Sequence, residues 1–293
     1  MPSAWLIHHV ASGQAFFTGA ACLIAAAWLS TRAKRTPLRA TRNALVGSGT
    51  ILVVASATPL PVWTYVILFV WTASWAVGEW HVGKLSARTV GALRLGVAAV
   101  WLAAVMLEAT YHVIPALPRL DRPMLGVVGD SLTAGTGDAH VVGWPTILGR
   151  EHGIDVRTHA RAGAGVAEAI GLAREITPAE NLVLLEIGGN DMLGGTPVAR
   201  FEEGLDRLLA EVVRPGRVVV MMELPLPPTF NAFGRSQRRL ARRYGVHLIP
   251  KRVLLGVLLR QGTTSDSVHL TEAGANAMAD AVWRMLGPAF TSD

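Results

Sequence analysis

The pattern of apolar and charged positions changes once along the chain, near residue 120. Before that point, long uncharged stretches alternate with short basic loops. After it, short apolar runs alternate with amphipathic segments of helical period, which is typical of a mostly parallel α/β sheet. The pattern therefore predicts two domains, residues 1–120 and residues 121–293.

The first domain contains apolar stretches long enough to cross the ~30 Å hydrocarbon core of a bilayer. Residues 43–78 carry no charge, and Pro59 and Pro61 interrupt them near the middle, which favours a hairpin of two short helices. A signal peptide is disfavoured because no basic segment precedes the first stretch and further apolar segments follow. We predict an all-α transmembrane domain of about four helices, with spans at about 11–30, 44–58, 62–79 and 95–114.

The charge distribution predicts the orientation of these spans. Residues 1–120 hold nine Lys and Arg against two Asp and Glu, whereas the rest of the chain holds 18 against 19. The isoelectric point of about 10.2 thus reflects basic loops beside apolar spans, and no nucleic-acid partner is expected. The positive-inside rule places both loops in the cytoplasm. The N-terminus and residues 121–293 then lie on the extracytoplasmic (periplasmic) side of a bacterial cytoplasmic membrane.

One acid, Glu108, falls inside the last predicted span, one helical turn before His112. Acids inside a membrane are candidates for functional groups. The alternative, which we favour, is that Glu108 pairs with His112 near the outer end of the span. The single cysteine, Cys22, allows no internal disulfide.

The pattern predicts a three-layer α/β fold for the second domain, with a mostly parallel five-stranded sheet. Several of its strands are unbroken apolar runs, so helices should cover both faces of the sheet. The expected strands are 124–128, 154–158, 182–187, 217–222 and 246–249. The expected helices are 142–152, 165–176, 197–213, 231–244, 251–259 and 271–286.

Candidate catalytic residues lie where the strands end. Ser131 follows the first strand on a tight strand-to-helix turn, at the sheet edge where open α/β folds place their ligands. A serine hydroxyl is a weak nucleophile unless a base takes its proton. Near the C-terminus, Asp266 and His269 precede the last helix and have the residue types of a base and its orienting acid.

Two further stretches follow strands at the same predicted edge. Asn190 comes after the third strand, where its amide is able to face a developing oxyanion. A glycine-containing turn, residues 161–165, follows the second strand and opens a helix, and a glycine there lets a backbone N–H approach a substrate. Each stretch alone also fits an ordinary loop. Their joint arrangement on one edge favours a catalytic site.

These motifs resemble the SGNH, or GDSL-type, serine hydrolases, over about residues 124–287. The matching blocks are residues 129–132 (Gly-Asp-Ser-Leu), 188–191 (Gly-Gly-Asn-Asp) and 266–270 (Asp-Ser-Val-His-Leu). Residues 143–145 and 184–188 look like the bacterial branch of periplasmic thioesterases, lysophospholipases and arylesterases. The resemblance implies the flavodoxin-like SGNH hydrolase fold for the second domain and does not extend to residues 1–120.

The resemblance also implies a role for each residue. Ser131 would be the nucleophile, His269 the base and Asp266 its orienting partner. The oxyanion hole would combine the Ser131 N–H, a glycine N–H from residues 161–165, which take the place of the family's second block, and the side chain of Asn190 from the third block, residues 188–191. The second block departs from the family because Arg161 stands in a run where an Asn usually precedes the glycine. We assign Gly165 because it directly precedes the helix, and Gly163 stays an alternative.

An arginine-rich stripe marks the predicted helix 231–244. We expect a solvated basic face, with contact to anionic lipid headgroups as the alternative. Its members are Arg235, Arg238, Arg239, Arg242 and Arg243.

The sequence therefore predicts a membrane-anchored extracytoplasmic serine esterase that needs no metal or other cofactor. Its partners would be membrane lipids and an acyl ester or thioester, either a lysophospholipid or other acyl lipid, or an O-acylated envelope glycan. An envelope acyltransferase with the same triad is the first alternative. A non-catalytic membrane protein that binds a ligand is the second. The sequence leaves the oligomeric state and acyl chain length open.

Overall fold

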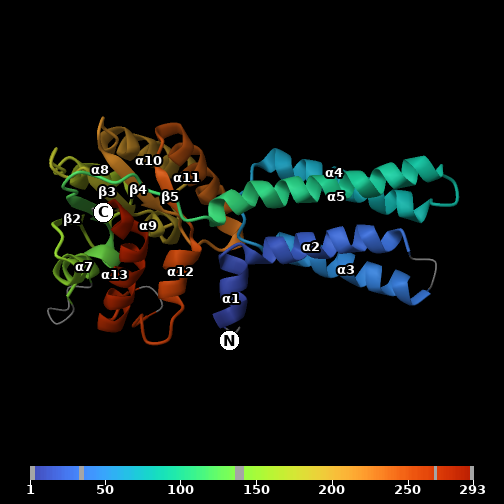
Figure 1. Ribbon diagram of the computed structural model, residues 1–293, viewed down its shortest axis with the longest axis horizontal. Coiled ribbons are helices and arrows are strands. Elements are labelled where there is room, and N and C mark those ends of the chain that lie inside the picture. Colours follow the sequence, from blue (N-terminus) through green and yellow to red (C-terminus); the bar gives the residue numbers. More distant parts are fainter. Residues whose placement is uncertain (1–3, 33–35, 136–141, 267–268, 291–293) are drawn as a thin grey trace. The chain divides into compact units, whose positions relative to one another are not determined.

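The computed structural model describes residues 4–32, 36–135, 142–266 and 269–290 (Figure 1). Its contacts divide the chain into a helical unit, Met1–His112 with Leu226–Asn231, and an α/β unit, Val113–Pro225 with Ala232–Asp293. The division falls at 112/113 instead of the predicted 120/121. The reason is that Leu117 and Leu120 pack on the core of the α/β unit. The Leu120 N–H also donates to the Ala289 carbonyl there, at 3.2 Å.

Helices occupy the four stretches that were predicted to span a membrane. Several of these helices begin at other residues than the predicted spans do. The helical unit consists of α1 (Ala4–Ala11), α2 (Gln14–Ser30), α3 (Thr36–Ala55), α4 (Val62–Trp80), α5 (Ala87–Ala109) and the 3₁₀ turn η1 (Thr110–His112). A bend of 77° separates α1 from α2 near the start of the first predicted span, where Gly13 has a φ of 87°. The third helix starts before the predicted span, so that Arg39 and Arg42 are helical instead of lying in a loop.

Length and mean hydropathy allow one helix of the described residues to cross a membrane, Ala87–His112. The bent pair α1 and α2 would supply a second crossing if it formed one broken span. Four crossings therefore remain a prediction.

The charged groups inside the helical unit are paired. Glu79 on α4 binds Arg94 on α5, with Oε1 and Nε 2.6 Å apart, and Arg42 on α3, with Oε2 and Nη1 3.4 Å apart. Glu108 is fully buried, and its Oε1 lies 3.4 Å from Nε2 of His112. This contact confirms the expected pairing of Glu108 with His112.

The α/β unit is built on a five-stranded parallel sheet in the order β2-β1-β3-β4-β5, which confirms the predicted sheet. The register aligns Gly129, the last residue of β1, with Ala160 of β2 and Glu186 of β3, so these strands end at one edge. The strands are β1 (Leu125–Gly129), β2 (Val156–Ala160), β3 (Leu182–Glu186), β4 (Val218–Met222) and β5 (His247–Ile249).

Helices cover both faces of this sheet (Figure 1). On one face α7 (Trp144–His152), α12 (Arg252–Leu258) and α13 (Glu272–Leu286) share a core with alternate strand residues such as Val127 and Leu184. On the other face lie α8 (Val166–Ala173), α10 (Val198–Val212) and α11 (Asn231–Tyr244), and Phe201 of α10 packs on Phe233 of α11 with ring centroids 4.9 Å apart. The predicted helices are all present. Two short ones, α6 (Ser131–Ala134) and α9 (Gly189–Leu193), were not predicted.

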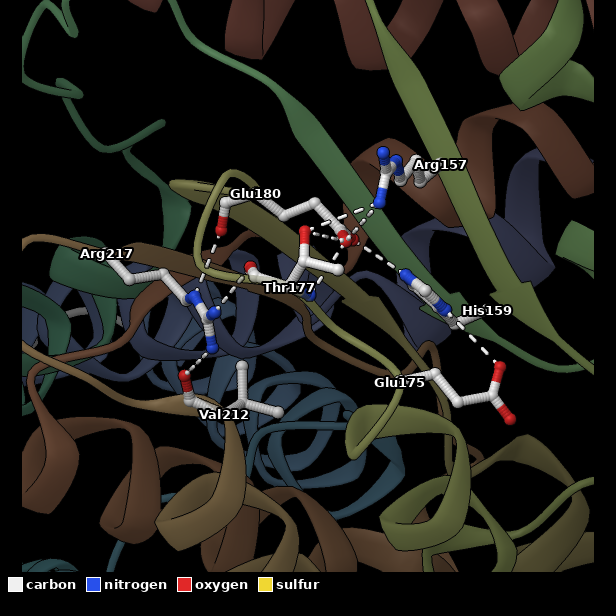
Figure 2. A network of polar contacts seen from close by, with 7 residues as sticks. All are labelled: Arg157, His159, Glu175, Thr177, Glu180, Val212 and Arg217. Carbon is white, nitrogen blue, oxygen red and sulfur yellow. Dashed lines mark hydrogen bonds and ion pairs between the residues drawn. The ribbon is translucent and has the colours of Figure 1, made fainter.

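A buried carboxylate joins β1, β2 and the turn before β3 (Figure 2). Glu180 Oε2 lies 2.7 Å from His159 Nε2, and Glu180 Oε1 accepts hydrogen bonds from the N–H and hydroxyl of Thr177 at 2.9 and 3.0 Å. Arg217 donates to the Glu180 carbonyl at 3.0 Å. Burial raises the pKa of Glu180, but these hydrogen bonds outweigh burial and bring the pKa below its ordinary value. Gly126 makes room for this group, because a Cβ there would lie 2.5 Å from Glu180 Oε2.

We expect Glu180→Gln to lower the free energy of unfolding at pH 7 by about 2 kcal/mol, since hydrogen bonds to a charged acceptor are lost. Because folding lowers this pKa, the stabilisation is present above the unfolded-state pKa and is lost as the pH falls through the folded-state pKa. The difference between wild type and variant should therefore shrink in acid. Urea unfolding of the full chain at a series of pH values measures it. Glu175→Gln is the control, because Glu175 is exposed and lies 3.8 Å from His159. Equal stability of wild type and Glu180→Gln at pH 7 would contradict the expectation.

Candidate active site

Ser131 lies directly beyond the end of β1, as the first residue of α6. Asp130 caps this helix, and its Oδ1 accepts the Leu132 N–H at 3.0 Å. The turn requires a glycine before it, because a Cβ on Gly129 would lie 2.5 Å from the Cβ of Thr133. Ser131 is 8% exposed, so the turn presents a largely buried hydroxyl at the carboxyl edge of the sheet.

Asp266 and His269 form a hydrogen-bonded pair in the loop before α13. Asp266 Oδ2 lies 2.6 Å from His269 Nδ1, and Asp266 Oδ1 accepts the His269 backbone N–H at 2.8 Å. The carboxylate therefore fixes both the ring and its backbone. With Nδ1 bound in this way, Nε2 is the ring nitrogen available to take a proton.

His269 reaches the same edge of the sheet as the serine turn. It lies near enough to Asp130 for its charge to act on the pKa of that carboxyl, which burial raises and the His269 charge lowers. Within the described residues, no hydrogen bond joins the Ser131 hydroxyl to His269. Such bonds are often long in free enzymes and tighten when substrate binds. Residues 267 and 268, part of the last motif, lie outside the described residues.

Asn190 brings the third block to the serine turn. It lies on α9, and its Nδ2 donates to Asp130 Oδ2 at 3.1 Å and to the Ala164 carbonyl at 3.0 Å. These bonds use both amide hydrogens. Asn190 thus links the turn after β1 to the turn after β2. It would have to exchange one of these acceptors to donate to an oxyanion.

The two candidate glycines of the second block differ in their surroundings. Gly165 caps α8, and its N–H donates to Oε2 of the exposed Glu168 at 3.0 Å. A Cβ on Gly165 would lie 2.9 Å from Asp191 Oδ2, so this glycine is close to the Asn190 block. Gly163 has a φ of 77°, a left-handed conformation that favours glycine, and an added Cβ would meet only open space. The close packing favours Gly165 as the oxyanion donor. Against it, the Gly165 N–H is already bound to Glu168 in this structure.

Two buried acids at this edge were not assigned a function from the sequence. Asp191 Oδ2 accepts the Val166 N–H at 2.9 Å and so ties α9 to the start of α8, while burial raises the pKa of Asp191. Glu186, the last residue of β3, is fully enclosed. Burial and the neighbouring Asp130 charge raise its pKa well above the ordinary value. The sequence did contain a sign of a role for Glu186, because a charged residue at the end of an otherwise apolar strand is unusual.

The arginine stripe on α11 is a solvated basic face only in part, since three of its five members are exposed. Arg238 is 2% exposed, and its Nε lies 2.6 Å from Oε1 of the buried Glu223. Arg243 binds Asp206 of α10, with Nη1 and Oδ1 3.0 Å apart, and Arg239 binds Glu202 of the same helix. The spacing within α11 does not reveal these partner acids, because they lie directly after β4 and on α10.

Comparison with known proteins matches the α/β unit to one family. Residues 127–277, just over half of the chain, match the model of the GDSL-like Lipase/Acylhydrolase family. Esterase TesA of Pseudomonas aeruginosa is 32% identical over 177 residues, which cover 55% of this chain and 87% of that protein. Thioesterase 1/protease 1/lysophospholipase L1 of Escherichia coli K12 is 27% identical over 178 residues, covering 57% of this chain and 85% of that protein.

Solved structures show the same fold. The crystal structure of TesA has a TM-score of 0.50 and 28% identity, covering 57% of this chain and 99% of that one. The psychrotrophic esterase EstA from Pseudoalteromonas has a TM-score of 0.51 and 21% identity, with 57% and 97% covered, and supports the fold alone. From the family match and the identity to an esterase covered over most of its length, we conclude that this chain belongs to the GDSL-like lipase/acylhydrolase family and is a serine ester hydrolase.

Proposed function

We propose that this chain is a membrane-anchored, extracytoplasmic esterase that cleaves acyl esters or thioesters through an acyl-enzyme on Ser131. The observation that carries the proposal is the Asp266–His269 pair, held at 2.6 Å at the sheet edge where Ser131 opens α6. The family membership supports the same assignment, because this chain carries the three sequence blocks that resemble the family. Asp266 orients the ring, His269 moves the proton and Ser131 carries the acyl group.

The reaction then follows from these positions. His269 Nε2 takes the hydroxyl proton of Ser131 as Oγ bonds to the acyl carbon, and the carbonyl oxygen becomes an oxyanion. The carbonyl re-forms as the bond to the leaving oxygen or sulfur breaks, and His269 gives that atom its proton. A water molecule then loses a proton to His269 and attacks the acyl-enzyme. The acid leaves, and the proton returns to Ser131.

The oxyanion would be held by the Ser131 N–H, the Asn190 amide and the Gly165 N–H. Asn190 is already placed 3.1 Å from the Asp130 carboxylate, next to the nucleophile, so it needs only to exchange an acceptor. Loss of one such donor typically lowers kcat by about 10²- to 10³-fold.

The outer surface of the helical unit supports membrane anchoring. Large apolar side chains on α4 and α5 are exposed, among them Phe69 at 74%, Leu95 at 75% and Met106 at 71%. Contiguous apolar surface of this kind marks a membrane or partner contact. Basic residues lie near the starts of α3 and α5, at the ends predicted to face the cytoplasm, among them Arg42 and Arg88, which supports the extracytoplasmic orientation. Lipids or envelope glycans carrying acyl esters are the substrate classes that such a location favours.

Ser131→Ala is expected to lower kcat for p-nitrophenyl esters by about 10⁴-fold or more, since the residual rate comes from binding and oxyanion contacts alone. Esters of graded chain length measure the rate and report the depth of the acyl site. Labelling by a fluorophosphonate should be lost in the same variant. Ser265→Ala, in the exposed loop before His269, is the control and should keep both signals. Hydrolysis or labelling that survives in Ser131→Ala would exclude Ser131 as the nucleophile. With an added acceptor, acylated acceptor among the products would favour the acyltransferase instead.

Glu168→Ala is expected to raise kcat/KM a few-fold if Gly165 is the oxyanion donor. The reason is that the Gly165 N–H must break its 3.0 Å bond to the Glu168 carboxylate before it donates to the substrate, and a hydrogen bond of this kind contributes about 1 kcal/mol. Steady-state kinetics on p-nitrophenyl butyrate measure the change. Glu203→Ala removes an exposed acid from α10 and serves as the matched control. An unchanged or lower kcat/KM would favour Gly163.

The proposed membrane orientation predicts which introduced cysteines a membrane-impermeant reagent labels in intact cells. In a Cys22→Ser background, a single cysteine introduced at Glu203 should react with a membrane-impermeant maleimide in intact cells, because residues 121–293 are extracytoplasmic. A cysteine at Arg88, in the first turn of α5, should react only after the membrane is opened. Gel-shift labelling of the full chain measures both. The reverse pattern would overturn the orientation, and reaction at both sites in intact cells would exclude a crossing by α5.

A further inference from the structure

The proposed chemistry leaves one buried acid beneath Ser131 without a role. Glu186 ends β3 directly opposite Gly129 of β1 and is 2% exposed. The rest of β3 is Leu and Val. Burying an acid among apolar side chains is costly unless its oxygen atoms and proton have partners. The contacts of Glu186 should therefore indicate its role in the site.

Those contacts lie on both sides of the nucleophile. Thr133 Oγ1 donates to Glu186 Oε2 at 2.9 Å. Asp130 lies next to the Glu186 carboxyl group, and its charge acts on the pKa of that group. Glu186 thus binds the residue two positions after Ser131 and lies next to the residue before it. Gly129 makes this arrangement sterically accessible, because a Cβ there would lie 2.3 Å from Thr133 Oγ1.

A third contact extends the network to the oxyanion donor. The carboxyl groups of Glu186 and Asp130 share a hydrogen bond. Asp130 in turn accepts the Leu132 N–H at 3.0 Å and the Asn190 amide at 3.1 Å. A continuous chain of hydrogen bonds therefore runs from Glu186 through Asp130 to Asn190.

A hydrogen bond between two carboxyl groups requires a proton on one of them. Burial raises the pKa of Asp130 as well, but N–H donors on both of its oxygens favour its charged form. Complete burial and the Asp130 charge both raise the pKa of Glu186, so Glu186 is the member that holds the proton. The other charges acting on Asp130 are His269, which lowers its pKa, and Asp191, which raises it. Neither supplies a donor that replaces Glu186.

We propose that Glu186 is a positioning residue whose protonated carboxyl group donates to Asp130 and thereby holds the Asn190 amide and the Ser131 turn in their catalytic arrangement. This inference rests on the proposed function, because it assigns Glu186 an effect through Ser131 and Asn190. Glu186 touches neither substrate nor reacting atoms. It acts by fixing the carboxylate that Asn190 binds.

The proposal predicts opposite outcomes for two substitutions of similar size. In Glu186→Gln, the amide donates to Asp130 and its oxygen accepts from Thr133, as the protonated acid does, so kcat should stay within about threefold of wild type. In Glu186→Leu, Asp130 loses its donor, and kcat should fall by roughly the 10²-fold typical of a displaced oxyanion donor, with KM nearly unchanged. Glu186→Met repeats the comparison if the leucine variant does not fold, as judged by its Tm. A kcat in Glu186→Gln as low as in Glu186→Leu would overturn the proposal.

A double-mutant cycle separates positioning from general stability. Because Glu186 is proposed to act through Asn190, Glu186→Leu should cost much less in an Asn190→Ala background than in wild type. Fully multiplicative losses would overturn the proposal. Glu180→Gln is the control for a buried acid, since Glu180 is not part of this network, and it should leave kcat unchanged. All kinetics use the full chain with p-nitrophenyl butyrate. Activity in Ser131→Ala would instead refute the proposed function itself.

Discussion

The site depends on parallel strands that end in register. Gly129, Ala160 and Glu186 are paired residues at the carboxyl ends of β1, β2 and β3, so the turns after these strands leave the sheet side by side. Only short side chains are then needed to connect them. Asn190 reaches both Asp130 and the Ala164 carbonyl. If the β1–β3 register shifted by one residue, the Glu186 side chain would move to the other face of the sheet and the network beneath Ser131 would be lost.

The sequence predicted those features that depend on neighbours along the chain. Apolar runs and amphipathic stretches located the strands and the longer helices, and Ser131, Asn190 and the 266–270 block were found because each adjoins a predicted strand or helix. Helices as short as α6 and α9 contain too few residues to show a period. The start of α3 was placed too late because Arg39 and Arg42 were read as loop residues, although basic residues are good helix formers. The missed features, Arg238 with Glu223 and Glu186 with Thr133, join residues that are distant in sequence.

The free site satisfies its own hydrogen-bond donors. Asn190 uses both amide hydrogens within the protein, and the Gly165 N–H is bound to Glu168. Buried donors are almost always paired, so an oxyanion hole that is largely enclosed must hold acceptors of its own before substrate arrives. In the proposed mechanism, catalysis depends on how much more strongly a developing oxyanion binds these donors than their present acceptors do. A neutral carbonyl such as that of Ala164 competes weakly with an oxyanion, whereas the Glu168 carboxylate competes strongly, which makes the two donors unequal before the reaction begins.

The two units both enclose an apolar core but expose different kinds of surface. In the α/β unit the apolar side chains of the strands are enclosed, and most of its remaining charges are at the surface. In the helical unit, charged groups such as Glu79 and Glu108 are paired internally, while Phe69, Leu95 and Met106 are exposed. Water would make that exposed surface costly, at about 25 cal/mol per Å², whereas lipid chains would not. The same distribution of side chains that is unfavourable in water is therefore favourable in a bilayer. An esterase joined to such a unit would meet acyl esters that concentrate in or beside the membrane.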